Sequence, residues 1–266
     1  MIMNKIKILL PAKIHPAVMA VWAALIAASH LLPTVPIWGG GSFSLAAALY
    51  PLSGIMFGPL AGALCTAVGG FLGSVVAPNT QNMLRLGSFI IWTTTAFTTG
   101  CIAWGSWPPV TIDPKGNFVI NGGIIIYLIG TVLWFTQEIG RSVILFPLFF
   151  YGIGFAALIL GSILASRILA GENTTLKLPI IWLCSYSGMI GGATIGNFFS
   201  LVLYKLPRET WIALTMAAPL ERALFSLGTV LIGAPLLAGL PKTGIFVGPR
   251  YESDESLPLQ NESGVS

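Results

Sequence analysis

The sequence predicts an all-α protein, a polytopic bundle of transmembrane helices with both termini in the cytoplasm. Of its 266 residues, 55% are hydrophobic and 8% are charged, and the mean hydropathy is +0.85. A soluble domain carries about 25% charged residues, which it needs to cover its solvated surface. The composition therefore excludes a soluble enzyme, a disordered chain and a secreted disulfide scaffold. It predicts a multi-pass protein of the cell membrane, embedded in the lipid bilayer.

Eight apolar segments have the composition of membrane spans, which need about 20 residues, with a range of about 17–25. Two of them, 44–57 and 122–136, are short, so we expect them to be tilted, re-entrant or shielded by neighbouring helices. The sequence therefore predicts six to eight spans, and we favour eight. The segments are residues 16–32, 44–57, 59–77, 86–105, 122–136, 143–169, 178–203 and 219–240.

The distribution of basic residues predicts the orientation, because Lys and Arg concentrate in cytoplasmic segments. With eight spans and a cytoplasmic N-terminus, eight basic residues are inside and four are outside. A cleaved signal peptide at the basic start is the less favoured alternative, since Ala27-Ala28-Ser29 is a poor cleavage site. The inside set is Lys5, Lys7, Lys13, Lys115, Arg167, Lys177, Lys242 and Arg250, and the outside set is Arg85, Arg141, Lys205 and Arg208.

Two segments fall outside the membrane. Asp113-Pro-Lys-Gly is a turn signal between two short β-prone runs, so residues 107–121 are expected to form a small hairpin. Residues 248–266 hold four acids and one Arg with little apolar content, which predicts a disordered cytoplasmic tail. The remaining residues, 1–247, are predicted to form a single transmembrane domain.

The sequence contains no enzyme signature, so we do not expect an enzyme. It has no zinc-protease His motif, nucleophile elbow, Walker loop or Cys-x-x-Cys pair. His15 and His30 flank the first span at opposite ends and are expected to be interfacial residues that cannot share a metal. The scattered net charge of +4 does not form a nucleic-acid patch. No cofactor or metal is expected, and any active transport requires a partner that hydrolyses ATP.

Small residues recur every four positions in three places. Such stripes let another helix backbone approach closely. Ala20, Ala24 and Ala28 form one stripe on the first span, where packing within the chain and docking of another membrane protein are both open. The two glycine stripes are expected to pack helices within the chain. They are Gly54, Gly58 and Gly62, and later Gly188, Gly192 and Gly196.

Polar residues near membrane depth are few, and ionisable groups there predict function by default. Glu138 and Arg141 are three residues apart and are candidates for a local pair, with Gln137 beside them. Glu221 and Arg222 open the last predicted span, where a headgroup position is the alternative.

Two predicted outer loops are polar but nearly uncharged, which suits a small polar or weakly acidic ligand better than a bare cation. A plain surface loop is the alternative for each. The first loop, 33–43, contains a triple glycine beside an aromatic residue, a combination flexible enough for a gate. The second loop is 78–85. The candidate residues of both loops are Trp38, Gly39, Gly40, Asn79, Gln81, Asn82 and Arg85.

The segment 49–74, with Phe57-Gly58-Pro59 inside it, resembles the second and third helices of the substrate-binding S components of energy-coupling factor (ECF) transporters. In that family one span ends in Phe-Gly-Pro and the next begins immediately. The resemblance covers about residues 16–77, and residues 219–242 are more weakly similar to the last S-component helix. This chain departs from the family at Gly70, where an aspartate is frequent, and most members have six helices.

The resemblance implies a subunit that captures a vitamin or similar micronutrient from the outer side. It also implies a T component and two ATPase subunits as partners, with the alanine stripe docking onto the T component. In the family the ligand lies under the loop after the first helix and beside the loop after the third. Here these loops, joined by Gln137, Glu138 and Arg141, supply the expected substrate-binding residues. The alternative function is a membrane scaffold subunit without a ligand of its own.

Overall fold

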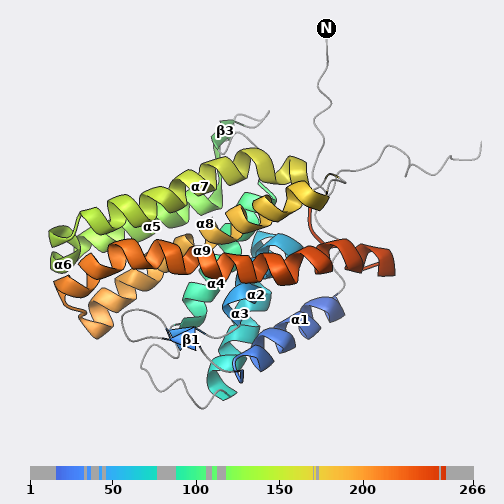
Figure 1. Cartoon of the computed structure of the whole chain (residues 1–266), viewed down its shortest axis with the longest axis horizontal. Helices are drawn as coiled ribbons and strands as arrows, with labels where there is room; N and C mark the ends of the chain where they lie inside the picture. The colour runs from blue at the N-terminus through green and yellow to red at the C-terminus, as the bar shows by residue number, and fades with distance from the viewer. Residues whose placement is uncertain are drawn as a thin grey trace, which may run out of the picture.

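The computed structural model describes residues 16–32, 35–36, 42–43, 46–76, 88–105, 110–112, 118–169, 171, 174–245 and 247–249, and structural statements refer to these residues. Within them the chain is a helical bundle with two short hairpins (Figure 1), which confirms the helical fold class. The helices are α1 (Pro16–Ser29), α2 (Ala46–Phe57), α3 (Pro59–Val76), α4 (Ser88–Ala103), α5 (Gly122–Thr136), α6 (Glu138–Ser142), α7 (Leu145–Leu169), α8 (Thr174–Phe199) with the π-helix η2 (Ser200–Tyr204), and α9 (Arg208–Gly239) with the 3-10 helix η3 (Leu240–Thr243).

Each of the eight predicted segments contains a helix. Among the described residues, four helical stretches are long and apolar enough to cross a membrane: Pro59–Val76, Leu145–Ala165, Thr175–Tyr204 and Arg208–Thr243. The helices over the other four segments are apolar and have 10–17 residues. The last helix begins earlier than the predicted span 219–240, because α9 begins at Arg208 and carries Pro219 inside it. Proline inside a membrane helix is tolerated where neighbouring groups satisfy the freed carbonyl.

The predicted hairpin is present: β3 (Val110–Ile112) pairs antiparallel with β4 (Phe118–Ile120). Asn121 then joins the hairpin to two helices. Its side chain accepts a hydrogen bond from the Gly123 N–H (2.8 Å), which caps α5, and donates to the Cys101 carbonyl of α4 (2.9 Å). A second hairpin, β1 (Val35–Pro36) with β2 (Ser42–Phe43), lies in the first predicted outer loop. The predicted disordered tail falls outside the described residues beyond 249.

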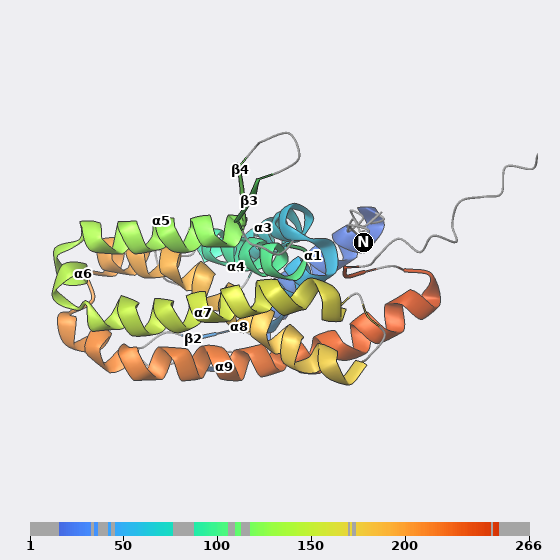
Figure 2. The ribbon, with the colours of Figure 1, turned by 90° about the horizontal axis from the view of Figure 1, so that it is seen from above.

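The helices form two groups, which Figure 2 shows from above. Helices α5, α7, α8 and α9 lie side by side around a core that includes Trp134, Phe146 and Trp211, and we name them the long group after the long helices α7, α8 and α9. Helices α1 to α4 form the smaller group, which packs at one end of the long group around a second core that includes Trp22 and Met56. Helix α4 joins the groups, because it packs against α2 and α3 on one side and against α8 on the other.

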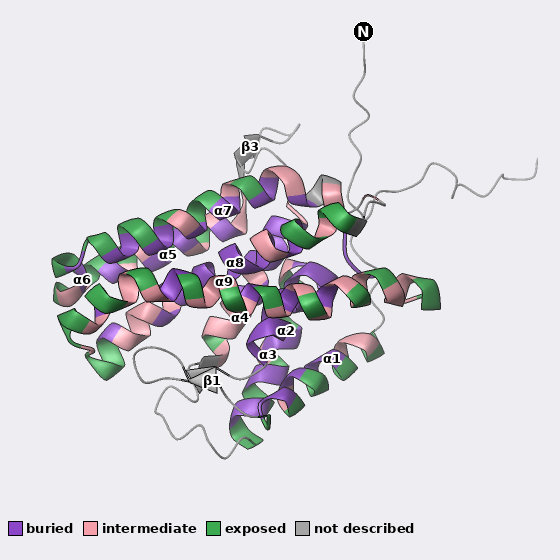
Figure 3. Ribbon diagram, viewed as in Figure 1, coloured by how far each residue is buried: buried purple, intermediate pink, exposed green. Residues whose placement is uncertain are grey.

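Helix α2 is the centre of the smaller group. All twelve of its residues are buried, and it appears as a continuous purple segment in Figure 3. Helices α1, α3, α4, α8 and α9 surround it. A helix that is apolar on every side is stable when it is fully enclosed. The structure confirms shielding by neighbouring helices for this short segment.

The turn between α2 and α3 depends on Gly58, whose φ of +84° is a left-handed conformation that other residues adopt at a cost. Pro59 then begins α3 with φ already suited to a helix. Gly54 lies where α2 meets α4: a Cβ there would overlap the Ala96 carbonyl oxygen and lie 2.7 Å from the Gly100 nitrogen. The other stripe glycines also lie at close helix contacts, Gly62 against α2 and Gly188, Gly192 and Gly196 against α4.

The ends of α1 to α4 gather at two opposite sides of this group. At one, which we name the hairpin end, the Trp104 indole donates to the Ile55 carbonyl (2.8 Å), and the Gly248 N–H donates to the Met56 carbonyl (2.9 Å). The other we name the loop end. There α1 ends before residues 33–45 and α2 begins after them, and α3 ends before residues 77–87 and α4 begins after them. Successive helices therefore run in alternate directions.

Candidate functional site

Three aromatic side chains meet at the loop end, and we name them the loop-end cluster: His30 just after α1, Tyr50 in α2 and Trp92 in α4. His30 Nδ1 lies 2.8 Å from the Ile26 carbonyl oxygen, and His30 Nε2 lies 2.9 Å from the Tyr50 hydroxyl. Because a carbonyl only accepts, we assign the proton to Nδ1, so that the Tyr50 hydroxyl donates to Nε2. The Trp92 ring stacks on Tyr50, with centroids 4.9 Å apart and an interplanar angle of 16°.

Two glycines of α3 make room for the cluster. A Cβ at Gly73 would lie 2.7 Å from His30 Cγ, and a Cβ at Gly70 would lie 2.8 Å from Trp92 Cε3. These distances are shorter than van der Waals contact, so either side chain would displace a ring of the cluster. The Trp92 ring thus takes up the space that a side chain at position 70 would need.

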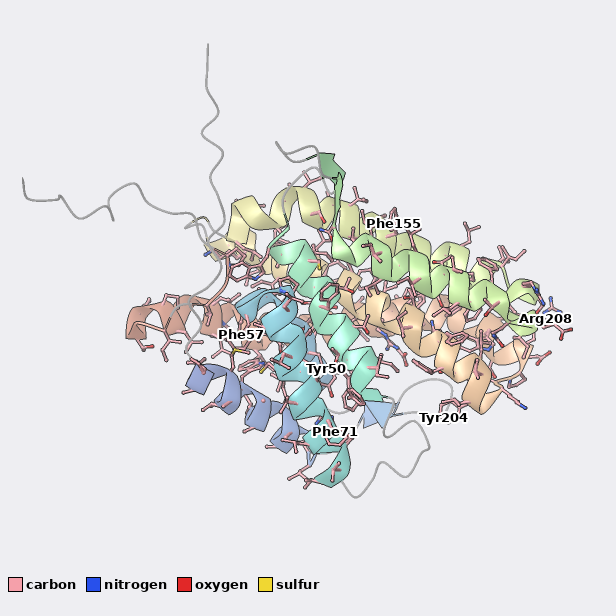
Figure 4. All side chains as sticks on the ribbon, turned by 180° about the vertical axis from the view of Figure 1, so that it is seen from behind. Tyr50, Phe57, Phe71, Phe155, Tyr204 and Arg208 are labelled. Carbon is pink, nitrogen blue, oxygen red and sulfur yellow. The ribbon has the colours of Figure 1, made fainter. Side chains whose placement is uncertain are left out.

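The loop-end cluster consists of uncharged aromatic side chains, two of which hydrogen-bond to each other. His30 and Tyr50 are buried, while Trp92 is half-buried and reaches toward the surface. Figure 4 shows Tyr50 among the helices of the smaller group, far from Arg208 at the edge of the longer one. Ring faces and hydrogen-bonding groups of this kind bind planar or polar organic groups. Among the described residues, no group of three or more His, Cys, Asp or Glu is placed to hold a metal ion.

Most of the expected substrate-binding residues lie outside the described residues, but the structure describes the strands and helices on either side of their loops. Residues 37–41 lie between β1 and β2, where Val35 pairs with Phe43, and residues 77–87 connect α3 to α4. Both connections begin and end beside the loop-end cluster. The predicted residues in this category are Trp38, Gly39, Gly40, Asn79, Gln81, Asn82 and Arg85.

The remaining three expected site residues lie elsewhere. Gln137, Glu138 and Arg141 are at α6, and both Figures 1 and 2 place α6 at the far end of the long group, away from α1 and α2. Glu138 and Arg141 are exposed, and no ion pair joins them in the described part of the chain. The structure therefore does not bring these three residues to the loop-end cluster.

Glu221 and Arg222 do not begin a helix, because α9 begins at Arg208. They lie near the middle of this 32-residue helix, each with 14% of its side chain exposed. Arg222 Nη1 lies 3.7 Å from Glu221 Oε2. The headgroup position considered from the sequence stays a prediction, because a helix of 32 residues is about 48 Å long and exceeds the roughly 30 Å of a bilayer's hydrocarbon core.

The alanine stripe of α1 faces outward. Ala20, Ala24 and Ala28 are all exposed, whereas Ala23 of the same helix is buried. Helix α1 packs on α3 through that buried side, since a Cβ at Gly69 would lie 2.5 Å from the Ala23 carbonyl oxygen. The stripe is therefore available to lipid or to another protein.

Comparison with protein-family models, with curated proteins and with solved structures gave no match. The site must therefore be interpreted from its own geometry. The sequence prediction missed all three residues of the loop-end cluster, and it assigned His30 to the interface. One signal was available: His30, Tyr50 and Trp92 each lie within seven residues of one of the two predicted outer loops, 33–43 and 78–85.

Proposed function

We propose that this protein is a membrane-embedded binding subunit for a small organic micronutrient, similar to the S components of ECF transporters. The observation that carries the proposal is the convergence of four helix ends, from α1, α2, α3 and α4, on the loop-end cluster. Both polar loops expected to hold the ligand start and finish there. A mostly apolar site with a few placed polar groups is typical of small-molecule pockets.

The proposed partners are a transmembrane T component and two ATPase subunits. The exposed alanine stripe supports this part of the proposal, because α1 packs through its other side. Without a nucleotide-binding loop the chain itself has no means of using ATP. A scaffold subunit has no need of polar loops anchored on an aromatic cluster, so the binding subunit is favoured.

The direct test is native mass spectrometry of the gently purified protein, which detects a retained small molecule as added mass. Trp92→Ala is expected to lower the retained fraction about tenfold or more, because it removes a ring that stacks at the loop end. Tyr50→Phe removes one hydrogen bond, worth about 0.5–1.5 kcal/mol, and is expected to have a smaller effect. Trp38→Ala and Arg85→Ala test the loops in the same assay.

Phe155→Ala is the matched control, since Phe155 is an aromatic residue of the long group, away from the loop end (Figure 4). If the Trp92 and Phe155 variants are folded and retain the small molecule equally, the site is elsewhere. If the wild-type protein retains nothing, the scaffold alternative gains support.

The proposed topology has eight spans with both termini in the cytoplasm. Two features support it: the excess of basic residues in the inside segments, and the alternating directions of α1 to α4. Under this topology the hairpin end is cytoplasmic and the loop end is outside. Reporter fusions at Lys13 and after Arg250 are expected to give cytoplasmic signals in both cases. An external signal from the second fusion alone would mean an odd number of spans.

A further inference from the structure

After α9 and η3 the chain turns back and returns to the hairpin end of the smaller group. The turn is at Gly244, whose φ of +81° is left-handed and whose N–H donates to the Pro241 carbonyl (3.1 Å). The Ile245 N–H donates to the Leu240 carbonyl (3.2 Å). A left-handed glycine with such bonds ends a helix and reverses the chain. We name residues 244–245 and 247–249 the strap.

The strap is packed against the end of α2. Val247 is buried and belongs to the same core cluster as Met56, and Ile245 packs against this cluster. The Gly248 N–H donates to the Met56 carbonyl (2.9 Å), and Pro249, which follows, is also buried. The strap is therefore part of the core of the smaller group, although it comes from the C-terminal part of the chain.

The strap completes a line of contacts along one face of α2. The Thr229 hydroxyl of α9 donates to the Ala48 carbonyl near the start of α2 (2.9 Å). One turn further along both helices, a Cβ at Gly233 would lie 2.8 Å from Leu52 Cδ1. The strap then reaches Met56, four residues beyond Leu52. Residues four apart share a helical face, so the C-terminal part of the chain follows α2 from near its start to its end.

The carbonyl groups at the end of α2 need donors from outside the helix. The last carbonyls of a helix have no partner within it, and α2 is buried along its whole length. The Trp104 indole supplies a donor to the Ile55 carbonyl, and the strap supplies one to the Met56 carbonyl. A buried carbonyl without a donor is costly. Withdrawal of the strap would therefore favour movement of the end of α2 or entry of water beside it.

Two glycines provide joints at which the strap can move. Gly244 and Gly248 have φ values of +81° and +83°, and they lie at the start and near the end of the strap. A Cβ at Gly244 would meet nothing within 4 Å, so the backbone conformation, and not packing, favours glycine there. Hinges are a few loop or helix-end residues that absorb changes in φ and ψ. The strap has this character.

From this arrangement we infer that the strap is a latch that couples the hairpin end to the loop-end cluster through α2. Tyr50 of the cluster is six residues before Met56, about 9 Å along the helix. Helix α2 meets the backbone of α4 at Gly54, and α4 carries Trp92, so a shift of α2 along α4 would separate the Tyr50 and Trp92 rings. The docked strap keeps them together, and its withdrawal opens the cluster. The consequence for a ligand rests on the proposed binding function.

The test compares the full chain with two shortened chains, one ending after Thr243 and one ending after Pro249. Hydrogen–deuterium exchange of the purified proteins is read by mass spectrometry for residues 46–52 and 53–57 of α2. Loss of the strap is expected to speed exchange about tenfold or more in both parts of α2, because local opening becomes easier. It is also expected to lower the fraction of retained small molecule about tenfold. The chain ending after Pro249 keeps the strap and is expected to match the full chain.

Should the shorter chain fail to fold, Gly248→Ala keeps the whole chain but disfavours the left-handed conformation, and a smaller change of the same pattern is expected. Gly239→Ala is its control, since a Cβ there would meet nothing within 4 Å. Unchanged exchange in α2, faster exchange in 53–57 alone, or an equal increase throughout α7 would each overturn the latch. If the full chain retains no small molecule, the proposed function fails, whereas exchange in 46–52 still tests the latch.

Discussion

Gly54→Ala is expected to destabilise the folded protein by about 2–3 kcal/mol, in spite of alanine's better helix propensity. The added Cβ would overlap the Ala96 carbonyl oxygen and lie 2.7 Å from the Gly100 nitrogen. Both atoms belong to the backbone of α4, so the clash is relieved only when two helices separate, and overpacking of this kind costs about 1–3 kcal/mol or more. The measurement is the midpoint of thermal unfolding in detergent.

Gly152→Ala is the matched control for this prediction. Gly152 lies in α7, and a Cβ there would meet nothing within 4 Å. The same substitution should therefore stabilise α7 by up to about 1 kcal/mol through helix propensity alone. A Gly54 variant that gains stability as the Gly152 variant does would show that α2 and α4 are not in backbone contact.

Ala24→Leu is expected to abolish assembly with the proposed T component while leaving the unfolding midpoint of the isolated protein unchanged. Ala24 is exposed on α1, so among the described residues a larger side chain there has room at the surface. At an interface built from small residues, the same bulk separates two helix backbones. The measurement is co-purification with the partner beside thermal unfolding of the subunit alone.

Ala23→Leu distinguishes docking from folding. Ala23 is 7% exposed and faces α3, so this neighbouring substitution should destabilise the subunit itself. If Ala24→Leu lowers the unfolding midpoint as much as Ala23→Leu does, the stripe packs within the chain. If Ala24→Leu leaves both assembly and stability intact, the stripe contacts lipid and the docking part of the proposal is wrong.

The positions of most helices were predictable because they depend on local composition. Apolar runs bounded by glycine, proline and polar residues identified eight helical segments, and Asp113-Pro-Lys-Gly identified the hairpin. The start of α9 was not predictable in this way. Pro219 resembles a helix start in sequence, but it lies inside a helix that continues from Arg208. Whether a proline begins a helix or lies inside one depends on the neighbouring helices that accommodate it.

The candidate site was predictable only in part, because its residues come from helix ends that are distant in the chain. The sequence indicated the two loops, yet it gave no reason to place His30, Tyr50 and Trp92 together. Their contact requires α1, α2 and α4 to meet around the space left by Gly70 and Gly73. Conversely, Gln137, Glu138 and Arg141 share the polar character of the loops but lie at the far end of the longer group.

What the sequence determined by itself is the class of molecule: a helical protein with apolar spans long enough for a membrane and with no catalytic motif. What only the tertiary structure decided is which side of each helix faces inward. It buries all of α2, and it turns Ala24 outward and Ala23 inward. The physical reason is that lipid is as apolar as a protein core, so membrane helices need no polar face to mark the outside. Their orientation is therefore set by how closely backbones and side chains pack, which depends on all the helices together.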